Sequence, residues 1–272
     1  FSSAVKRDEN NGRSDLTVNY AEIVSSIKPK WFVMETVARI LKTQKLVEAK
    51  EIFHAAGYGL SQAVLDASLC GVPQARKRFI LIGCLGECDG FIDNVISSRL
   101  DDKPLTVKQY LGDEIDIQYY YRHPRSYKRR GIFSVDEPSP TIRGVNRPLP
   151  EGYPIHPGDP VDNVEGIRPL TTEERSRIQT FPKDFKFIGN KTDKEQMIGN
   201  AVPVNLGKFV GECIQAYLDG HPNCEAIGQI NYSKEDCIKQ IASTYRPWEY
   251  LRDGSIAYRL FEDKADYNKQ NS

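Results

Sequence analysis

The stretch GVPQARKRFILIG, residues 71–83, decides the fold of this chain. Its second part, residues 78–83, is short and mostly apolar, as expected of a strand inside a sheet. An earlier run, WFVM at residues 31–34, is entirely apolar. Such a run is typical of a strand that is covered on both faces of a parallel sheet. The two runs together predict an α/β protein.

Segments with a helical spacing of apolar residues surround these strands. Residues 19–28 form one such segment, which stops before Pro29, and residues 45–56 form another, which ends at Gly57. Residues 58–67 are predicted to form a further strand. The order helix, strand, helix, strand, strand is that of the later part of a doubly wound α/β sheet. The strand and glycine-rich loop that usually begin such a sheet are not found in the sequence.

Composition divides the chain into four stretches. Residues 1–90 contain the predicted sheet, and residues 91–168 lose its pattern and become rich in proline, glycine and aromatic residues. We expect the second stretch to be a small irregular domain. Residues 169–220 regain helical spacing, with helices predicted at residues 171–179 and 203–218. Residues 221–272 form a polar extension to which the sequence assigns no role.

Charge and cysteine content narrow the function classes. The 37 basic and 37 acidic residues give no net charge, so contact with nucleic acid would need a local basic patch. No apolar run approaches the roughly 20 residues that span a bilayer, and no secretory leader is recognised. The cysteines lack metal-binding spacing, which predicts reduced thiols, a cytoplasmic location and no metal. They are Cys70, Cys84, Cys88, Cys213, Cys224 and Cys237.

Polar residues near the predicted strands are candidates for chemistry. Glu35 directly follows the run 31–34, and ligands of open α/β sheets bind beyond the carboxyl ends of the strands. The alternative is a glutamate that caps the next helix. Gln74, Arg76 and Arg78 alternate along the chain as it enters a strand, which predicts that they point to one side. Converging guanidinium groups suit carbonyl or phosphate oxygens, although a solvated basic strand edge would give the same pattern.

Basic and aromatic residues are concentrated at residues 119–147. Seven arginine and lysine side chains stand there against two acidic ones and are interleaved with tyrosines. This local excess fits a surface that contacts a phosphate backbone, while the alternative is a solvated charged face. The basic residues are Arg122, Arg125, Lys128, Arg129, Arg130, Arg143 and Arg147.

A further motif, MIGNAVPV at residues 197–204, places a turn before a helix N-terminus, which is a weak signal for an anion site.

Four segments in this order resemble the motifs of the DNA cytosine-5 methyltransferases. GVPQARKRF resembles the Gln-x-Arg-x-Arg motif of that family, and FVMETV resembles its Glu-Asn-Val motif. RPLTTEERSRIQTFP resembles the penultimate motif, and GNAVPVNLG resembles the last one. The likeness spans residues 1–218. It implies the later part of a Rossmann-like S-adenosylmethionine-dependent methyltransferase sheet (residues 1–90), a target-recognition domain (91–168), and helices that return to the catalytic domain (169–220).

The resemblance also implies a mechanism. In this family a cysteine thiolate adds to C6 of a cytosine that is flipped out of double-stranded DNA, and C5 then takes the methyl group of S-adenosylmethionine. Glu35 would protonate N3, and Arg78, assisted by Arg76, would hold the cytosine carbonyl. The expected cofactor contacts are Asn200, Ala201 and Val202. The expected DNA contacts are Ser2, Lys6, Arg13, Gln74, Arg122, Arg125, Arg129, Arg130 and Arg143.

The nucleophile is missing from the matched segments. The family's Pro-Cys-Gln motif precedes a Phe-Ser pair by one residue, and this chain begins at Phe1-Ser2. We therefore expect a fragment, a truncated form or one subunit of a split enzyme, inactive alone, with a second chain as a possible source of the N-terminal half. Thr36 replaces the family's asparagine, and Val5 stands where the family has glycine.

Two functions remain open from the sequence. The first is a DNA cytosine-5 methyltransferase of a restriction-modification system. The second is a catalytically inactive DNA-binding remnant or regulatory subunit, which the missing nucleophile and the two motif changes favour. A nicotinamide-dependent oxidoreductase is excluded because the sequence has no glycine fingerprint for that cofactor.

Overall fold

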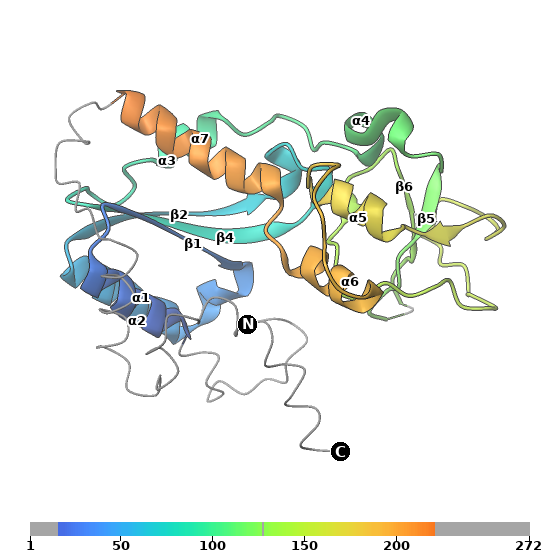
Figure 1. Cartoon of the computed structure of the whole chain (residues 1–272), viewed down its shortest axis with the longest axis horizontal. Helices are drawn as coiled ribbons and strands as arrows, with labels where there is room; N and C mark the ends of the chain where they lie inside the picture. The colour runs from blue at the N-terminus through green and yellow to red at the C-terminus, as the bar shows by residue number, and fades with distance from the viewer. Residues whose placement is uncertain (1–15, 127, 221–272) are drawn as a thin grey trace, which may run out of the picture.

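The computed structural model describes residues 16–126 and 128–220 and forms two lobes (Figure 1). The sheet lobe holds β1 (Trp31–Val37), β2 (Tyr58–Asp66) and β4 (Lys77–Leu85), in the order β1-β4-β2. Helices α1 (Leu16–Ile27) and α2 (Gln44–Ala55) cover one face of this sheet. The predicted strands and helices of this lobe are all present, with ends that differ by a few residues.

The sheet is antiparallel among the described residues, which corrects the prediction of a parallel sheet. β4 pairs antiparallel with both neighbours, and Val37 lies opposite Arg78 at one end of the β1–β4 ladder. β1 and β2 do run parallel to one another, because α2 connects them as a crossover. β4 enters between them after a short reversal, and a short connection between neighbouring strands gives antiparallel pairing.

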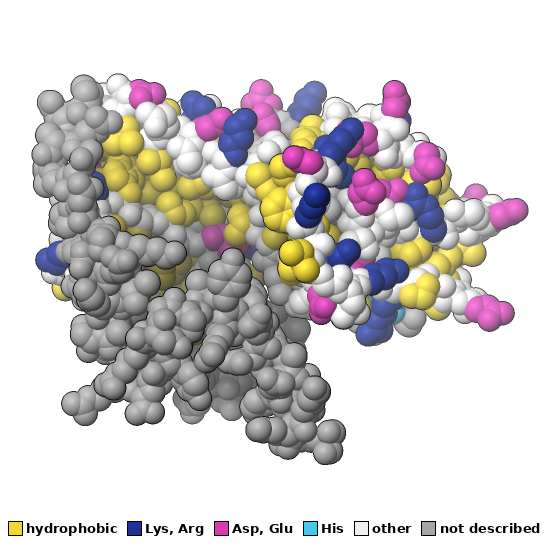
Figure 2. Space-filling view, viewed as in Figure 1, with side chains coloured by type: hydrophobic (Ala, Val, Ile, Leu, Met, Phe, Trp, Pro, Cys, Tyr) yellow, Lys and Arg dark blue, Asp and Glu magenta, His cyan; other side chains and the backbone are white. Residues whose placement is uncertain are grey.

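Burial along β1 alternates instead of being continuous. Phe32 and Met34 are buried against α1 and α2, whereas Val33, between them, is 40% exposed. Trp31, on the same face as Val33, packs against Phe91 and Tyr217. The apolar run at residues 31–34 is therefore covered along one face but only at Trp31 on the other, so the expectation of two covered faces holds only in part. Figure 2 shows hydrophobic side chains of the sheet lobe next to α7, on the side away from α1 and α2.

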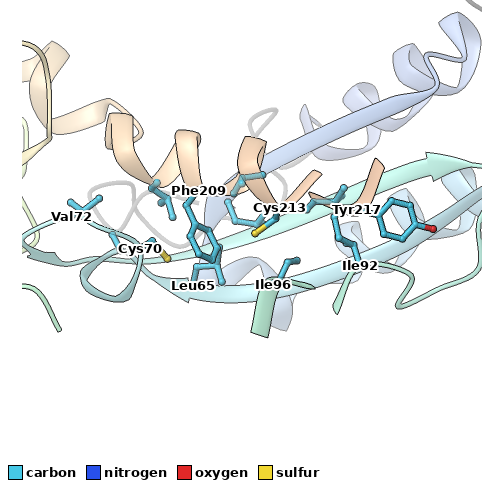
Figure 3. Packing of buried hydrophobic residues seen from close by; sticks show 13 residues of the cluster. Leu65, Cys70, Val72, Ile92, Ile96, Phe209, Cys213 and Tyr217 are labelled. Atoms are coloured by element: carbon cyan, nitrogen blue, oxygen red, sulfur yellow. The ribbon is translucent and has the colours of Figure 1, made fainter. Parts of the chain in front are cut away.

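The opposite face of β2 and β4 is covered by α7 (Val204–Gly220) and α3 (Asp93–Ser98). In Figure 3, Phe209 of α7 points toward Leu65, and Tyr217, farther along the helix, lies beside Ile92. The sheet core thus includes side chains from beyond residue 90. Gly83 of β4 lies opposite Phe32 of β1, and a Cβ atom at residue 83 would stand 2.0 Å from the phenyl ring of Phe32. Residue 83 therefore has to be a glycine.

The small lobe is irregular, as residues 91–168 predict. β5 (Tyr119–Tyr121), β6 (Ile132–Ser134) and β8 (Arg168–Pro169) form its own small sheet, while β3 (Gln74–Ala75) pairs with β7 (Ser139–Pro140) and joins the two lobes. Its helices are α4 (Val107–Leu111), α5 (Thr172–Ile178) and α6 (Lys191–Asn200). Short 3₁₀ turns lie at Ala38–Lys42, Ala67–Leu69 and Gly112–Glu114.

Two helices that follow residue 168 pack in the small lobe. Ile178 of α5 and Ile198 of α6 share a core cluster with Tyr120 and Phe133, and only α7 returns to the sheet. The sequence patterns predicted α5 and α7, but not α6, whose apolar residues are few. No helix within residues 16–126 and 128–220 is long and apolar enough to cross a membrane.

Candidate functional site

Glu35 and Arg78 face one another across β1 and β4. Arg78 Nε lies 2.8 Å from Glu35 Oε1, and the two side chains are 14% and 26% exposed, respectively. Glu35 lies within β1 and not beyond its end, which corrects the sequence reading. The ladder explains the contact: Arg78 is opposite Val37, and Glu35 is on the same face as Val37, two residues away. The pair is close to solvent and therefore accessible to a ligand.

Burial lowers the pKa of Arg78, while the neighbouring Glu35 carboxylate raises it again. One of the guanidinium's other nitrogens, Nη1, donates to the carbonyl oxygen of Lys77 at 2.8 Å. Among the described residues, Nη2 has no hydrogen-bond acceptor. Arg78 thus combines a fixed position with donor capacity for a ligand.

Gln74 and Arg76 turn toward the small lobe instead of toward a shared cleft. The Gln74 amide donates to Gln179 Oε1 at 2.8 Å and accepts from the Ile142 backbone N–H at 2.9 Å. Gln74 has no exposed surface, so it cannot contact DNA directly here. The expectation that all three side chains converge on one cleft is therefore wrong: Gln74 and Arg76 bind the small lobe, and Arg78 pairs with Glu35.

Arg76 links three segments of backbone. Its Nη1 donates to Ile142 O at 3.1 Å, and its Nη2 donates to Gly199 O and Ala201 O at 3.3 and 3.1 Å. Burial, reinforced by Arg78 and opposed by Glu35, lowers the pKa of Arg76 to about 10. Arg76 is thus electrostatically close to the Glu35–Arg78 pair but is itself 3% exposed. It supports the candidate site from behind.

The turn between α6 and α7 carries Asn200, Ala201 and Val202. The Ala201 carbonyl is occupied by Arg76 and by Gln179 Nε2, whereas the Asn200 and Val202 side chains are exposed. An exposed amide beside an exposed apolar side chain fits a ligand that is partly polar and partly apolar. Sequence reasoning missed Gln179, which bonds to Gln74 and to this turn. A glutamine that follows a fully buried isoleucine at a helix end was the available signal.

Arginine side chains line a hollow in the small lobe. Arg122 donates to Thr141 O at 3.0 Å, Arg143 donates to His123 O, and Arg147 Nη1 lies 3.4 Å from His123 Nε2. Burial, reinforced by Arg143, lowers the pKa of Arg122 to about 10. Burial also lowers the pKa of Arg143, with Arg125 and Arg147 acting in the same direction. The hollow therefore concentrates positive charge.

The predicted basic residues differ in whether an acid neutralises them. Arg130 binds both carboxylate oxygens of Glu137, at 3.0 and 2.5 Å, and lies over the Phe133 ring. Among the described residues, no carboxylate forms an ion pair with Arg122, Arg143 or Arg147. Arg125 and Arg129 are exposed. The hollow is thus better suited than Arg130 to attract an anion.

Three predicted DNA contacts, Ser2, Lys6 and Arg13, lie outside the described residues. Of the thiols that the structure describes, Cys70, Cys84 and Cys213 are buried and Cys88 is exposed. Burial raises the pKa of Cys70 to about 12, which keeps that thiol protonated. The described residues contain no cluster of side chains suited to hold a metal ion.

Comparisons with known proteins agree with one another. The family model for C-5 cytosine-specific DNA methylases matches residues 1–216. The type II methyltransferase M.HindV of Haemophilus influenzae is 60% identical over 215 residues, which cover 79% of this chain and 71% of that protein. M.HgiDI of Herpetosiphon aurantiacus is 56% identical over 219 residues, which cover 80% and 71%.

The fold is similar to that of solved methyltransferases. The crystal structure of S. pombe Dnmt2 superposes with a TM-score of 0.53 and 16% identity, covering 79% of this chain and 75% of that one. A methyltransferase encoded within an E. coli prophage gives a TM-score of 0.53 and 18% identity, covering 77% and 75%. At these identities the likeness shows the α/β fold alone.

Proposed function

The chain belongs to the family of C-5 cytosine-specific DNA methylases, and from that membership we propose that it supplies the base-binding and DNA-recognition parts of a type II modification enzyme. The reaction is transfer of a methyl group from S-adenosylmethionine to C5 of a cytosine in double-stranded DNA. The relatives named as type II methyltransferases support this reaction class.

One observation carries the proposal: Glu35 and Arg78 form an accessible pair at 2.8 Å. The N3 and O2 atoms of cytosine are neighbours on one edge of the ring, so a carboxyl group and a guanidinium group side by side match that edge. Glu35 would donate a proton to N3, and Arg78 would donate a hydrogen bond to O2. Both contacts draw electrons from the ring and make C6 more electrophilic.

A nucleophilic thiolate for C6 must come from outside the described residues. Cys70, Cys84 and Cys213 are buried. Cys88 is exposed, but it follows the end of β4 opposite to Arg78. The seven steps from Arg78 to Leu85 along β4 alone span about 23 Å at roughly 3.3 Å per residue. No described thiol can therefore reach a base that is held by Glu35 and Arg78.

The cofactor would contact Asn200 and Val202. S-adenosylmethionine supplies the methyl group when it is bound, and its polar amino-acid part and apolar surfaces suit an amide beside a valine. Ala201 would contribute backbone only, because its carbonyl already accepts from Arg76 and Gln179. Arg76 would act as a positioning residue that holds this turn next to the Glu35–Arg78 pair. The rest of the pocket would come from the same part of the enzyme as the thiolate.

The small lobe would recognise the duplex. The arginines of the hollow and the exposed Arg125 and Arg129 would meet backbone phosphates, and extrusion of the cytosine would cost a few kcal/mol. Gln74 would act indirectly, through Ile142, in place of a direct DNA contact. We thus propose that target recognition lies within residues 91–168.

Complementation tests the proposed function. The full chain is mixed with a polypeptide that carries the family's Pro-Cys-Gln segment and cofactor loop, then incubated with methyl-labelled S-adenosylmethionine and DNA. We expect label in DNA cytosine only when both polypeptides are present. Absence of transfer in every pairing, despite salt-sensitive DNA binding, would instead support the inactive DNA-binding protein that Thr36 favours.

The Glu35→Gln variant tests the role of the carboxyl group in the same assay. General acid catalysis contributes roughly 10²- to 10⁴-fold, so we expect a rate loss of that size with DNA binding retained. Glu173→Gln, at an exposed position of α5, is the matched control and should transfer normally. A Glu35→Gln protein that keeps the wild-type rate would remove Glu35 from the mechanism.

A further inference from the structure

A short segment without helix or strand carries two of the arginines of the hollow. Residues 143–147, which we call the arginine strap, run from Arg143 to Arg147 past Gly144 and Asn146. An irregular segment has no ladder partners, so its backbone polar groups need other partners to hold one conformation. The question is what fixes the strap.

The strap is tied to helices α5 and α6 at three points. Arg175 of α5 donates through Nη2 to the Arg143 carbonyl. Gly199 of α6 packs directly on the strap, since a Cβ atom at Gly199 would lie 2.1 Å from the Gly144 backbone nitrogen. Asn146 Nδ2 donates to Leu170 O at 2.8 Å and reaches Glu195 Oε1 at 3.4 Å.

Glu195 stands at the centre of these ties. Its carboxylate is 3% exposed, forms an ion pair with Arg175 Nη1, and accepts from Thr172 Oγ1 at 2.8 Å. One carboxylate thus reaches the strap twice: through Arg175 to Arg143, and directly at Asn146. Gly199 lies one helical turn after Glu195, so the contact with Gly144 comes from the same face of α6.

An enclosed ion pair gives little net stability compared with an apolar replacement of the same shape, because both charges lose their hydration. This pair does what apolar side chains cannot do: it holds a backbone carbonyl and a side-chain amide of an irregular segment. We therefore explain the Arg175–Glu195 pair by the two groups that it orients, the Arg143 carbonyl and the Asn146 amide.

We propose that Glu195 is a positioning residue for DNA recognition, which holds the arginine strap so that Arg143 and Arg147 face a backbone phosphate of the duplex. This inference rests on the proposed function. Arg122 and His123 complete the wall of the same hollow. The guanidinium groups are pre-oriented before DNA arrives, so less conformational entropy is lost on binding.

Duplex binding by the Glu195→Gln variant tests the proposal, because charge and position predict opposite results. Loss of a negative charge alone would tighten binding to DNA. Loss of positioning would weaken it, by roughly tenfold, and would lower the slope of log Kd against log salt by about one to two, since each phosphate contact contributes about 0.9. The measurement is fluorescence anisotropy of a labelled mixed-sequence DNA duplex over a series of KCl concentrations.

The matched control is Glu174→Gln. Glu174 binds Arg168 and caps α5, and among the described residues it forms no hydrogen bond or ion pair with the strap. Its replacement by glutamine removes the same charge. We expect its DNA affinity to be unchanged or slightly higher. An Arg143→Gln/Arg147→Gln variant should lose affinity to a similar extent, and adding Glu195→Gln to it should have little further effect, because coupled residues are not additive.

A folded Glu195→Gln protein that binds as tightly as wild type, or more tightly, overturns the proposal. If that variant does not fold, Asn146→Ala decides by the same readout, because it removes the direct tie and leaves the ion pair in place. A wild-type chain that fails to bind duplex DNA would count against the proposed function. Unaffected strap variants of a chain that binds DNA reject only the positioning role.

Discussion

The two lobes each contain an arginine–glutamate pair, and the pairs differ in what surrounds them. Arg78 and Glu35 lie on adjacent strands with side chains 14% and 26% exposed. Arg175 and Glu195 lie on α5 and α6 with both side chains 4% exposed. The first pair is carried by a regular backbone ladder and does not need to hold it. The second is enclosed and holds the segment around it.

This difference follows from how each lobe satisfies its backbone. In the sheet lobe, ladder hydrogen bonds satisfy the backbone polar groups, and two apolar clusters form the core. Helix α2 begins after Thr43, whose side chain forms no capping hydrogen bond. In the small lobe, α4, α5 and α6 all begin with capping boxes, and buried polar side chains bind loop carbonyls. A ladder frees its polar side chains for ligands, whereas an irregular lobe uses many of them for its own support.

Arg175→Met should produce the largest effect on stability. It leaves the Glu195 carboxylate buried without its partner, which typically costs about 3–5 kcal/mol. We expect urea denaturation to show that loss, and the double variant Arg175→Met/Glu195→Leu to recover only part of it. Full recovery is not expected because the Arg143 carbonyl would lose its Arg175 donor, and Asn146 Nδ2 would keep only its bond to Leu170 O. Complete recovery would mean that the pair does not support the strap.

Gly199→Ala should have the next largest effect. The added Cβ atom would meet the backbone of residues 143 and 144 at 2.1–2.6 Å, and backbone cannot rotate away as a side chain tip can. Overpacking of this kind costs about 1–3 kcal/mol. Gly211→Ala in α7 is the control, since no atom lies within 4 Å of the new methyl group. There the better helix propensity of alanine should stabilise the chain slightly, and equal losses at both positions would contradict the contact.

Sequence reasoning succeeded where a periodic pattern encodes the structure. The spacing of apolar residues located α1, α2, β2 and β4. The resemblance to the methyltransferase motifs named Glu35 and Arg78 together as residues that bind the cytosine, and the structure brings their side chains to 2.8 Å. Sequence reasoning failed on sheet direction, because the apolar run 31–34 does not encode which neighbour it will have. It also failed on Gln74 and Glu195, whose partners lie far along the chain: Gln179 is 105 residues from Gln74.

Polar support in the small lobe should also appear as acid sensitivity at Asp159. Burial raises the pKa of this carboxyl, but hydrogen bonds from the His156 and Ile132 backbones and from the Tyr153 hydroxyl outweigh it, so the pKa is lowered overall. A lowered folded-state pKa adds stability above the ordinary pKa of aspartate, and that stability is lost as the pH falls through the folded-state value. Asp159→Asn should therefore cost about 1–2 kcal/mol at pH 7, a charged hydrogen-bond effect reduced by partial exposure.

The check on Asp159 is urea denaturation of wild type and Asp159→Asn at pH 7 and in steps below pH 4. The difference between them should shrink as the wild-type carboxyl becomes protonated. A difference that stays constant with pH would show that the loss comes from packing and not from the charge.

The capping boxes give the smallest and most local contrast. Thr171 Oγ1 accepts from the Glu174 backbone N–H at 3.1 Å, and the Glu174 carboxylate accepts from the Thr171 backbone N–H at 2.6 Å while also binding Arg168. Thr106 forms the same box in α4 with the neutral Gln109.

Thr171→Ala should cost about 1 kcal/mol, the usual value for loss of an N-cap. Thr106→Ala should cost less, because its box includes no charged group. Thermal unfolding of the two variants side by side measures the order. If Thr106→Ala proves the more costly change, the charged network around Glu174 does not strengthen its cap, and polar support in the small lobe would then depend on enclosed groups such as Glu195 and not on those at its surface.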